Sequence, residues 1–439
     1  MNKKFQKTLS VALPMFFSTN NLSFAMDFNW PKFGNFAHLN KEANNKNNIT
    51  LDSYINENLV YSPFSLRAAL ITAANGTSDS NVRYDVAQYM GFKSLENANS
   101  WLEKITNKKI DGVNIANSMW LSEKLLNNNY LDNMLNFTGF IVDKLKAHCD
   151  FISTNDGHDV INNWVKDKTK GKIPSIFDKL DPETLLVLVN TVYFNSKFVK
   201  EFEDTGSIEF KGIDKTTKNV PTIKDAYESA RSCDYCATND YQAVRIPFEE
   251  NGCYLYMVLP KTNSEFDKVK NVDTKELAKN MKSRNVHLEI PRFRIESSLT
   301  LNDYCNSNNL LQTLMDAKLD NIHPNAKISK IVQKVVFEIT PEGVEAAAAS
   351  GDMFVQECCQ AQPEVKMVFD HAFIGFIADK DNNVLFKVNM KNYEQDNYYE
   401  SYHDKNGKNY EQDNYYDKND ASSEFNVCQE DEDNYCEDE

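Results

Sequence analysis

A run of small side chains most constrains what this chain can fold into. Residues 342–350 read EGVEAAAAS, and a polar, loop-like stretch separates them from the apolar run at residues 369–376. Taken alone, four alanines beside a glutamate predict the start of an exposed helix, because alanine has the highest helix propensity. The interpretation of this run therefore depends on the motifs that accompany it.

Five further segments precede this run in a characteristic order. They lie at residues 58–70 (NLVYSPFSLRAAL), 161–173 (INNWVKDKTKGKI), 188–194 (LVNTVYF), 246–260 (beginning IPF and ending YLYMVLP) and 287–293 (HLEIPRF). In this order they resemble strand 6B with helix B, helix F with its following turn, the third strand of sheet A, and strands of sheets B and C of the serpin family. The small-residue run resembles the hinge of that family's reactive-centre loop.

The resemblance implies an α+β fold, with three β-sheets (A, B and C), about nine helices and an exposed reactive-centre loop. The local patterns agree with it. Ser62 and Pro63 provide a cap and a first-turn proline for a helix. Ile161, Trp164 and Val165 have the i, i+3, i+4 spacing of one apolar helix face. The continuous apolar run at 187–194 predicts a strand that is covered on both faces.

Composition predicts one large domain and an acidic tail. Of the 439 residues, 41% are hydrophobic, which is enough for a substantial core. Residues 391–439 contain four lysines and sixteen acidic residues, so they carry −12 of the net charge of −16. The rest is nearly balanced, which argues against nucleic acid and heparin as partners, because both need clustered basic residues. The best such cluster, Lys104, Lys108 and Lys109, is small. We expect a monomer without a membrane partner.

We expect three segments: a signal peptide at 1–25, the serpin domain at 26–392 and a tail at 393–439. Lysines precede the apolar run at 9–17, and Ser23 and Ala25 are small residues at the positions that a signal peptidase reads. The run is too short to span a bilayer, which takes about 20 residues, so we expect secretion. The tail repeats KNYEQDNYY at 391–399 and 408–416, and its acidity predicts disorder. A calcium-binding or adhesive role is the alternative for this tail.

The resemblance implies a serine protease inhibitor that acts as a suicide substrate, through insertion of its cleaved loop into sheet A as a new strand. Small residues suit such a loop, because overpacking a finished sheet costs about 1 to 3 kcal/mol per site. Strand alternation would turn Val344, Ala346, Ala348 and Ser350 inward. The hinge assigned by the resemblance consists of Glu342, Gly343, Val344, Glu345, Ala346, Ala347, Ala348 and Ala349.

Four positions depart from the family pattern and favour the alternative, a non-inhibitory serpin that acts as a binding or adhesion module. Pro341 replaces an acidic residue, so we expect no salt bridge from it to Arg292. Asp352 has the inward parity, where an unpaired carboxylate costs several kcal/mol. Gln333 replaces a histidine, and Phe198 replaces a tryptophan at the top of the sheet. We therefore expect an inhibitor that is also partly cleaved as a substrate. The shutter assigned by the resemblance consists of Asn58, Ser62, Ser65, Asn190 and Gln333.

Counting from Gly343 as the family does gives Glu357 and Cys358 as the reactive bond, and a loop one residue longer would shift it to Cys358 and Cys359. Residues 354–359 are similar to the Glu-Cys-Cys centre of the granzyme B-inhibiting intracellular serpin. A protease that accepts glutamate needs a basic pocket. We rank a granzyme B-like or glutamate-specific serine protease first, an elastase-like enzyme second and a caspase third. The neighbouring subsites are Phe354, Val355, Gln356 and Cys359.

No enzyme motif accompanies these segments. The chain has no Gly-x-Ser-x-Gly elbow, no phosphate-binding glycine loop and no His-Glu-x-x-His. We therefore expect no catalytic residue, no metal and no cofactor. Nine cysteines leave at least one unpaired within the chain. Cys233 and Cys236 form a single CxxC, for which a local disulfide or two free thiols are expected rather than a zinc site.

Overall fold

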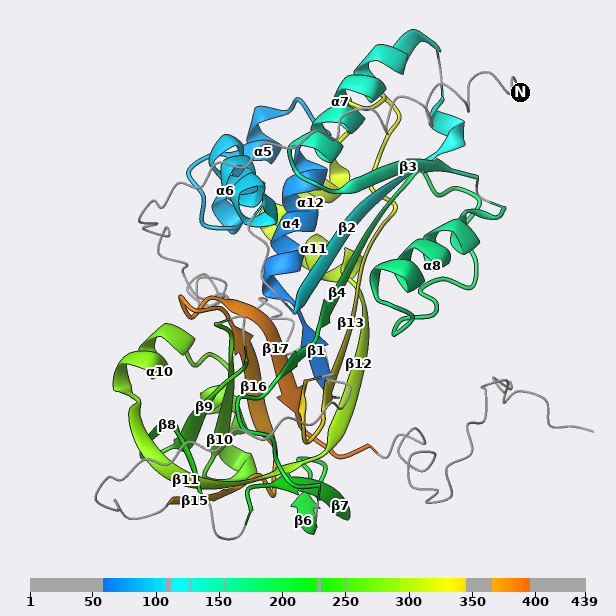
Figure 1. Cartoon of the computed structure of the whole chain (residues 1–439). Helices are drawn as coiled ribbons and strands as arrows, with labels where there is room; N and C mark the ends of the chain where they lie inside the picture. Colours follow the sequence, from blue (N-terminus) through cyan, green and yellow to red (C-terminus); the bar gives the residue numbers. More distant parts are fainter. Residues whose placement is uncertain are drawn as a thin grey trace, which may run out of the picture. The chain divides into compact units, whose positions relative to one another are not determined.

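A computed structural model describes residues 58–107, 112–126, 128–153, 155–204, 206–226, 230–249, 252–344 and 365–394 (Figure 1). The expected signal peptide, the hinge residues from Glu345 onward, the expected reactive bond and the tail from residue 395 lie outside these ranges. The part of the chain that is described contains nine α-helices and two β-sheets, so the expected α+β class is confirmed, and the segments expected for sheets B and C lie in one continuous sheet.

The first sheet, which corresponds to sheet A, has the strand order β3-β2-β4-β13-β14-β5, with β12 paired to β13. Strand β4 runs parallel to β13, while β2 and β12 are antiparallel to β4 and β13 respectively. The strands of this sheet are β2 (Val113–Ser122), β3 (His148–Ile152), β4 (Leu186–Phe194), β5 (Ser196–Lys197), β12 (Phe293–Thr300), β13 (Lys330–Ile339) and β14 (Gly343–Val344).

The second sheet combines the segments expected for sheets B and C. Its order is β1-β17-β16-β10-β9-β8-β11-β7-β6, and β15 runs parallel to β11. Its strands are β1 (Leu59–Tyr61), β6 (Ser207–Lys211), β7 (Thr217–Lys224), β8 (Arg231–Ala237), β9 (Tyr241–Pro247), β10 (Tyr254–Pro260), β11 (Lys282–Pro291), β15 (Val365–Val368), β16 (Phe373–Ala378) and β17 (Val384–Met390).

The helices pack against both sheets. They are α4 (Pro63–Ala74), α5 (Ser80–Tyr89), α6 (Leu95–Asn107), α7 (Leu131–Asp143), α8 (Gly157–Lys168), α9 (Phe266–Val269), α10 (Thr274–Asn280), α11 (Asn302–Ser307) and α12 (Asn309–Asp316), with 3₁₀ turns η1 (Glu123–Leu125), η2 (Asn128–Tyr130) and η3 (Asn263–Glu265). Figure 1 shows α4 and α8 on opposite sides of β2 and β4. No helix among the residues that the structure describes is long and apolar enough to span a bilayer.

Helix α4 begins where its sequence predicts. The Ser62 hydroxyl accepts a hydrogen bond from the Ser65 amide at 3.2 Å, and Pro63 occupies the first turn. Since proline lacks an N–H that the first turn does not use, this start costs no backbone hydrogen bond. The predicted cap is confirmed, and it sets the direction of a helix that is buried along almost its whole length.

Strand β4 is buried at every position, as its apolar run predicts. Leu186 and Leu188 pack in the core beneath α4, while Val187 and Val189 pack in the core beneath α8. Because successive side chains alternate between faces, both faces of the strand are covered. This strand is the centre of the sheet and borders the path that an inserted strand would take.

Helix α8 lays its predicted apolar face on the sheet. Ile161 and Val165 are fully buried, and Trp164 packs edge to face on Trp120 of β2, with ring centroids 5.8 Å apart. The connection that follows α8 is tied back to the helix by Asn162. Its side chain accepts the amide hydrogens of Ile176 and Phe177 and donates to the Phe177 carbonyl at 2.7 Å. Helix and connection therefore form one cover over this face.

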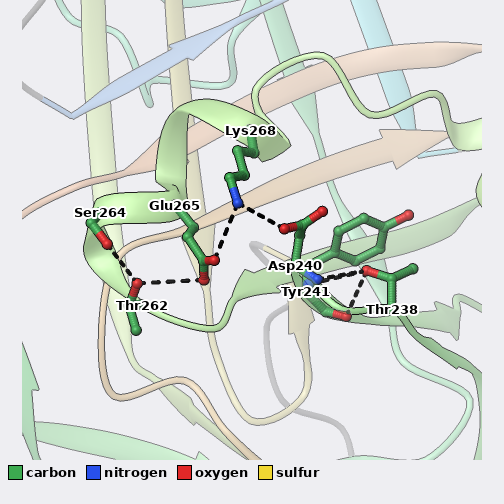
Figure 2. Close-up of polar contacts among 7 residues, drawn as sticks. All are labelled: Thr238, Asp240, Tyr241, Thr262, Ser264, Glu265 and Lys268. Carbon is green, nitrogen blue, oxygen red and sulfur yellow. Dashed lines mark hydrogen bonds and ion pairs between the residues drawn. The ribbon is translucent and has the colours of Figure 1, made fainter.

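A polar cluster fixes the turn between β8 and β9 to the segment after β10 (Figure 2). The Lys268 ammonium lies 2.8 Å from an Asp240 oxygen and 3.3 Å from a Glu265 oxygen. The Thr262 hydroxyl lies 2.8 Å from the Ser264 hydroxyl, and it donates to a Glu265 carboxylate oxygen at 3.4 Å. The ion pairs are largely exposed, so they add little free energy of folding. They link Lys268 of α9 to the turn before β9 and to η3.

The two cysteines of the CxxC are both free thiols. Cys233 packs in the core that faces the first sheet, whereas Cys236 packs against the core on the other side of β8. Residues three apart on a strand point to opposite faces, so these thiols cannot form a disulfide with each other. The alternative of a local disulfide is therefore wrong. Burial raises the pKa of the Cys233 thiol to about 12 and also raises the pKa of the Cys236 thiol.

The described part of the chain continues to the first residues of the expected tail. Tyr393 is buried next to Phe210, and its hydroxyl donates to the Arg292 carbonyl at 2.9 Å. Its own carbonyl accepts from the Lys218 ammonium at 2.8 Å. These contacts join the end of the domain to β6, β7 and the turn between β11 and β12.

Candidate functional site

The first hinge residues already form a short strand at the end of the first sheet. Val344 pairs antiparallel with Ile339 of β13 on one side and with Ser196 of β5 on the other. The chain reverses at Pro341 and Glu342, and the Thr340 amide donates to the Gly343 carbonyl at 2.8 Å across the bend. Val344 is 1% exposed, so its side chain is inside the core, the direction that strand alternation predicts. The strand β14 therefore lies between β13 and β5.

Gly343 is required by the close approach of β5. A Cβ atom at this position would lie 2.2 Å from the Ser196 carbonyl oxygen and 2.8 Å from the Lys197 Cα. Contacts below 3 Å with backbone atoms cannot be relieved by a side-chain rotation. The glycine thus allows the hinge to pair with β5.

The bend before β14 is held by two backbone hydrogen bonds. The Phe202 amide donates to the Pro341 carbonyl, and the Phe198 amide donates to the Glu342 carbonyl, both at 2.8 Å. Phe198 is fully buried and stacks on Phe248 at 5.2 Å, with Phe202 edge to face at 5.3 Å. Phenylalanine thus fills the position for which the family pattern has tryptophan, and its neighbours are also phenylalanines.

Arg292 has an acidic partner that the sequence did not reveal. Its guanidinium lies 2.9 Å from a carboxylate oxygen of Asp204. Pro341 contributes only its carbonyl to the bend, so it is not part of this ion pair. Position 341 thus supplies no salt bridge to Arg292, as expected. Asp204, two residues after Phe202, is the acidic partner of Arg292 instead.

Below the hinge, β4 and β13 pair directly with each other. The register runs from Lys330 with Val187 to Val335 with Val192. Beyond this point β13 continues to Ile339, where it pairs with β14 instead. The two strands therefore separate at the end where the hinge enters, and they close below it.

A network of neutral side chains lies beneath this closed pair. Gln333 of β13 accepts the Ser62 amide hydrogen at 2.9 Å and donates to the Ser62 carbonyl and to the Asn190 side-chain oxygen, both at 3.1 Å. Asn190 donates to the Ser65 carbonyl at 3.2 Å and to the side chain of Asn117. Gln333 thus connects β13, β4 and the start of α4 through three buried hydrogen bonds.

The structure brings four of the five expected shutter residues together and places the fifth elsewhere. Asn58 accepts the amide hydrogens of Lys391 and Asn392 at 2.8 and 3.0 Å and donates to the Asn392 carbonyl, so it ties β1 to the end of β17. Asn117 of β2, which the sequence reasoning missed, joins the network in its place. The sequence gives no signal that singles out Asn117, because β2 also contains Asn114, Ser118 and Ser122.

A lysine connects β13 to the cover formed by α8. The Lys334 ammonium donates to the Ser175 carbonyl, which lies in the connection after α8, and forms an ion pair with Glu296 of β12, both at 2.9 Å. Glu296 is also 3.2 Å from Arg294. Any widening of the sheet between β4 and β13 must therefore also disturb the contact between β13 and this connection.

The remaining candidate residues lie outside the part of the chain that the structure describes. They are the hinge residues Glu345, Ala346, Ala347, Ala348 and Ala349, and the loop residues Phe354, Val355, Gln356, Glu357, Cys358 and Cys359.

Replacing Gly343 by alanine should destabilise the fold. The added Cβ would collide with the backbone of β5, and we expect a loss of about 1 to 3 kcal/mol in the free energy of unfolding, measured by denaturant titration. Gly375→Ala is the matched control, because the nearest atom to its Cβ is 3.6 Å away in another buried strand. An equal loss in both variants would contradict the role assigned to the contact with β5.

Replacing Gln333 by alanine should cost about 2 to 4 kcal/mol, because it leaves buried partners on Ser62 and Asn190 without hydrogen bonds. The difference from the unchanged protein should be the same at pH 5.5 and pH 8, since the network contains only amide and hydroxyl side chains. Gln312→Ala, on the exposed side of α12, should stay within about 0.5 kcal/mol. A difference that grows or shrinks with pH would show that a titratable group belongs to the network.

Comparisons with known proteins agree with this geometry. A family model described as "Serpin (serine protease inhibitor)" matches residues 42–390. Leukocyte elastase inhibitor A of Mus musculus is 30% identical over 353 residues, which cover 75% of this chain and 91% of that protein. An uncharacterized serpin-like protein of Methanosarcina acetivorans is 28% identical over 383 residues, which cover 80% of this chain and 86% of that protein.

Solved structures show the same fold. The native state of the thermophilic serpin tengpin matches with a TM-score of 0.68 and 22% identity, covering 84% of this chain and 96% of that chain. Serpin48 of the insect Tenebrio molitor matches with a TM-score of 0.64 and 23% identity, covering 78% of this chain and 93% of that chain. From the family match and the fold together, we conclude that this chain belongs to the serpin family.

Proposed function

We propose that this serpin inhibits a serine protease that cleaves after glutamate, by inserting its cleaved loop into the first sheet. The observation that carries the proposal is the position of β14. The hinge is already paired with β13 and β5, at the end where β4 and β13 separate. The name of the mouse relative, an elastase inhibitor, supports inhibition as the activity class. The chain would act as a suicide substrate and not as an enzyme.

The register of β14, extended along β13 and β4, gives the position that each loop residue would take in the inserted strand. Pairing of Val344 with Ile339, continued antiparallel, would bring Ser350 opposite Gln333 on β13. Pairing of Val344 with Ser196, continued in the same way, would bring Ser350 opposite Asn190 on β4. Gln333 and Asn190 are partners in the closed sheet. The two edges thus lead to one register, in which Ser350 would enter the neutral network.

The same register explains the small side chains. Ala346 would face Phe337 and Phe194, and Ala348 would face Val335 and Val192, all of which belong to the core between the sheets. On the other face, Ala347 would lie next to Val336, beneath the cover formed by α8. Larger residues at these positions would need the core or the cover to move.

Insertion releases free energy because the single β4–β13 pairing is replaced by two pairings, one on each edge of the inserted strand. Fifteen inserted residues span roughly 50 Å at about 3.3 Å per residue. At about 1 kcal/mol for each new hydrogen bond, the gain is on the order of 10 kcal/mol. The un-inserted protein would therefore be held by kinetics and not by equilibrium.

Glutamate before the bond selects the class of protease. A protease that binds Glu357 needs a basic pocket, so granzyme B-like and glutamate-specific enzymes are the first candidates. An elastase-like enzyme that cuts after Val355 or Cys358 is the second, which the name of the mouse relative also supports. A caspase is the third, and a trypsin-like enzyme with an acidic pocket should not be inhibited. We further propose that residues 1–25 direct export, which N-terminal sequencing of the exported protein would test.

The direct test is incubation with granzyme B, a glutamyl endopeptidase, elastase and trypsin, followed by a denaturing gel and mass spectrometry of the released C-terminal fragment. We expect a boiling-resistant band at the summed mass with a glutamate-directed protease, and a fragment that begins at Cys358. A band with elastase alone would move the target to the second class. Complete cleavage by every protease without such a band would contradict inhibition and favour the binding or adhesion module.

Asp352 should limit the efficiency of this inhibitor. In the register above its side chain would lie between Leu188 and Ile331, which are both buried in the core beneath α4. Since burial of an unpaired carboxylate costs several kcal/mol, Asp352→Ala should lower the number of inhibitor molecules consumed per protease by about twofold or more. Glu345→Ala, on the opposite parity, is the control and should leave this number unchanged. The prediction fails if both variants behave like the unchanged protein.

A further inference from the structure

A buried ion pair between Arg231 and Asp225 contacts residues 200–202, the segment that is hydrogen-bonded to the bend before the hinge. The Arg231 guanidinium lies 2.8 Å from an Asp225 oxygen, with the two side chains 4% and 0% exposed. Asp225 itself is fixed to β11, since its backbone amide donates to the Leu288 carbonyl and its second carboxylate oxygen accepts the Leu288 amide hydrogen, both at 3.0 Å. The carboxylate is therefore a rigid support for Arg231.

Arg231 uses its other donors on the backbone that follows Phe198. One terminal nitrogen donates to the Lys200 carbonyl at 3.1 Å, and the other lies 3.5 Å from the Glu201 carbonyl. The guanidinium carbon lies 3.4 Å from the centre of the Phe202 ring, within the range of a cation–π contact. One side chain thus holds three consecutive residues, 200 to 202.

These three residues lead directly to the hinge. The Phe202 amide donates to the Pro341 carbonyl and the Phe198 amide to the Glu342 carbonyl, and Gly343 follows with no room for even a Cβ. Burial lowers the pKa of Arg231, and the nearby Asp225 carboxylate opposes this shift. The guanidinium is a cation because arginine keeps its proton in proteins. A rigid series of contacts therefore runs from β11 through Asp225 and Arg231 to the bend at residues 341 and 342.

We propose that Arg231 is a positioning residue for loop insertion, which it serves by fixing the pivot around which the hinge turns. The inference rests on the proposed function. Insertion must be faster than hydrolysis of the acyl-enzyme, and it must start from Val344 in the register set by β5 and β13. If residues 200–202 shift, the bend shifts with them, and the strand starts to form from a misplaced end. Loop recognition by the protease does not depend on this pivot.

The chain offers a matched control for this proposal. Arg245 of β9 also forms an ion pair with an aspartate, Asp234, and its guanidinium carbon lies 4.5 Å from the centre of the Tyr254 ring. Its other contacts are with Tyr256 and Asn382, and none of these partners belongs to the hinge or to residues 198–202. The same substitution at Arg231 and Arg245 therefore separates an effect on the pivot from the loss of an arginine–aspartate pair.

The test compares Arg231→Lys with Arg245→Lys. Lysine keeps a charge next to each aspartate, but its ammonium cannot reproduce the planar fork that reaches two carbonyls and stacks on Phe202. For Arg231→Lys we expect about threefold or more inhibitor consumed per protease, with the rate constant of loop cleavage unchanged. We also expect the amide hydrogens of Phe198 and Phe202 to exchange about tenfold faster. Arg245→Lys should change neither quantity.

A second variant guards against misfolding. Asp225→Asn combined with Arg231→Met removes both charges while it keeps an acceptor for the Leu288 amide, so no buried charge is left unpaired. It should show the same loss of protection at Phe198 and Phe202 even where overall stability is retained. Unchanged exchange at these amides in both variants, or equal effects at Arg245, would overturn the proposal. If the unchanged protein inhibits no protease, the proposed function fails, and amide exchange alone then decides whether Arg231 holds the bend.

Discussion

The direct pairing of β4 with β13 is the contact on which the rest of this structure depends. The two strands are parallel, they occupy the centre of the first sheet, and six residue pairs join them below the hinge. An additional strand can enter only by separating them, and it would then pair with both. In the proposed function, the stability of this one seam would set both the lifetime of the un-inserted protein and the rate of insertion.

Three sets of contacts hold the seam, each on a different side. Gln333 joins the two strands to the start of α4 through neutral hydrogen bonds. Lys334 joins β13 to the connection after α8, which covers the opposite face. The bend before β14 fixes the end at which the strands already diverge. In the proposed insertion, opening would therefore begin at the hinge, where β13 already pairs with β14 instead of β4, and proceed along the seam.

At the hinge end of the first sheet there is little room for a larger side chain or a shift of the backbone. Gly343 has no space for a Cβ, and the carbonyls of Pro341 and Glu342 both receive hydrogen bonds from a segment held by Arg231. Such a constraint is useful when a strand must start to form in one register only, because a slip by one residue would turn every inward side chain outward. After a slip by one residue, Glu345 would take the inward position that Val344 occupies in the core.

Much of this arrangement could be predicted from the residues. The cap at Ser62, the doubly buried run of β4, the apolar face of α8 and the inward side of Val344 are local patterns that depend on neighbouring residues in the chain. The resemblance of these segments to one family, in order, also predicted the fold. Short-range patterns of this kind are readable because neighbours in the chain remain neighbours in space.

Only the tertiary structure decided which distant residues meet. Asn117 replaces Asn58 in the network around Gln333, Asp204 supplies the partner of Arg292, and Arg231 reaches Lys200 from another sheet. Cys233 and Cys236 are only three positions apart in the sequence, but they lie on opposite faces of the sheet. The chain by itself determined the elements and the inward side of each strand, because these depend on local periodicity. Partners at long sequence separation depend on sheet register and packing, which local periodicity does not encode.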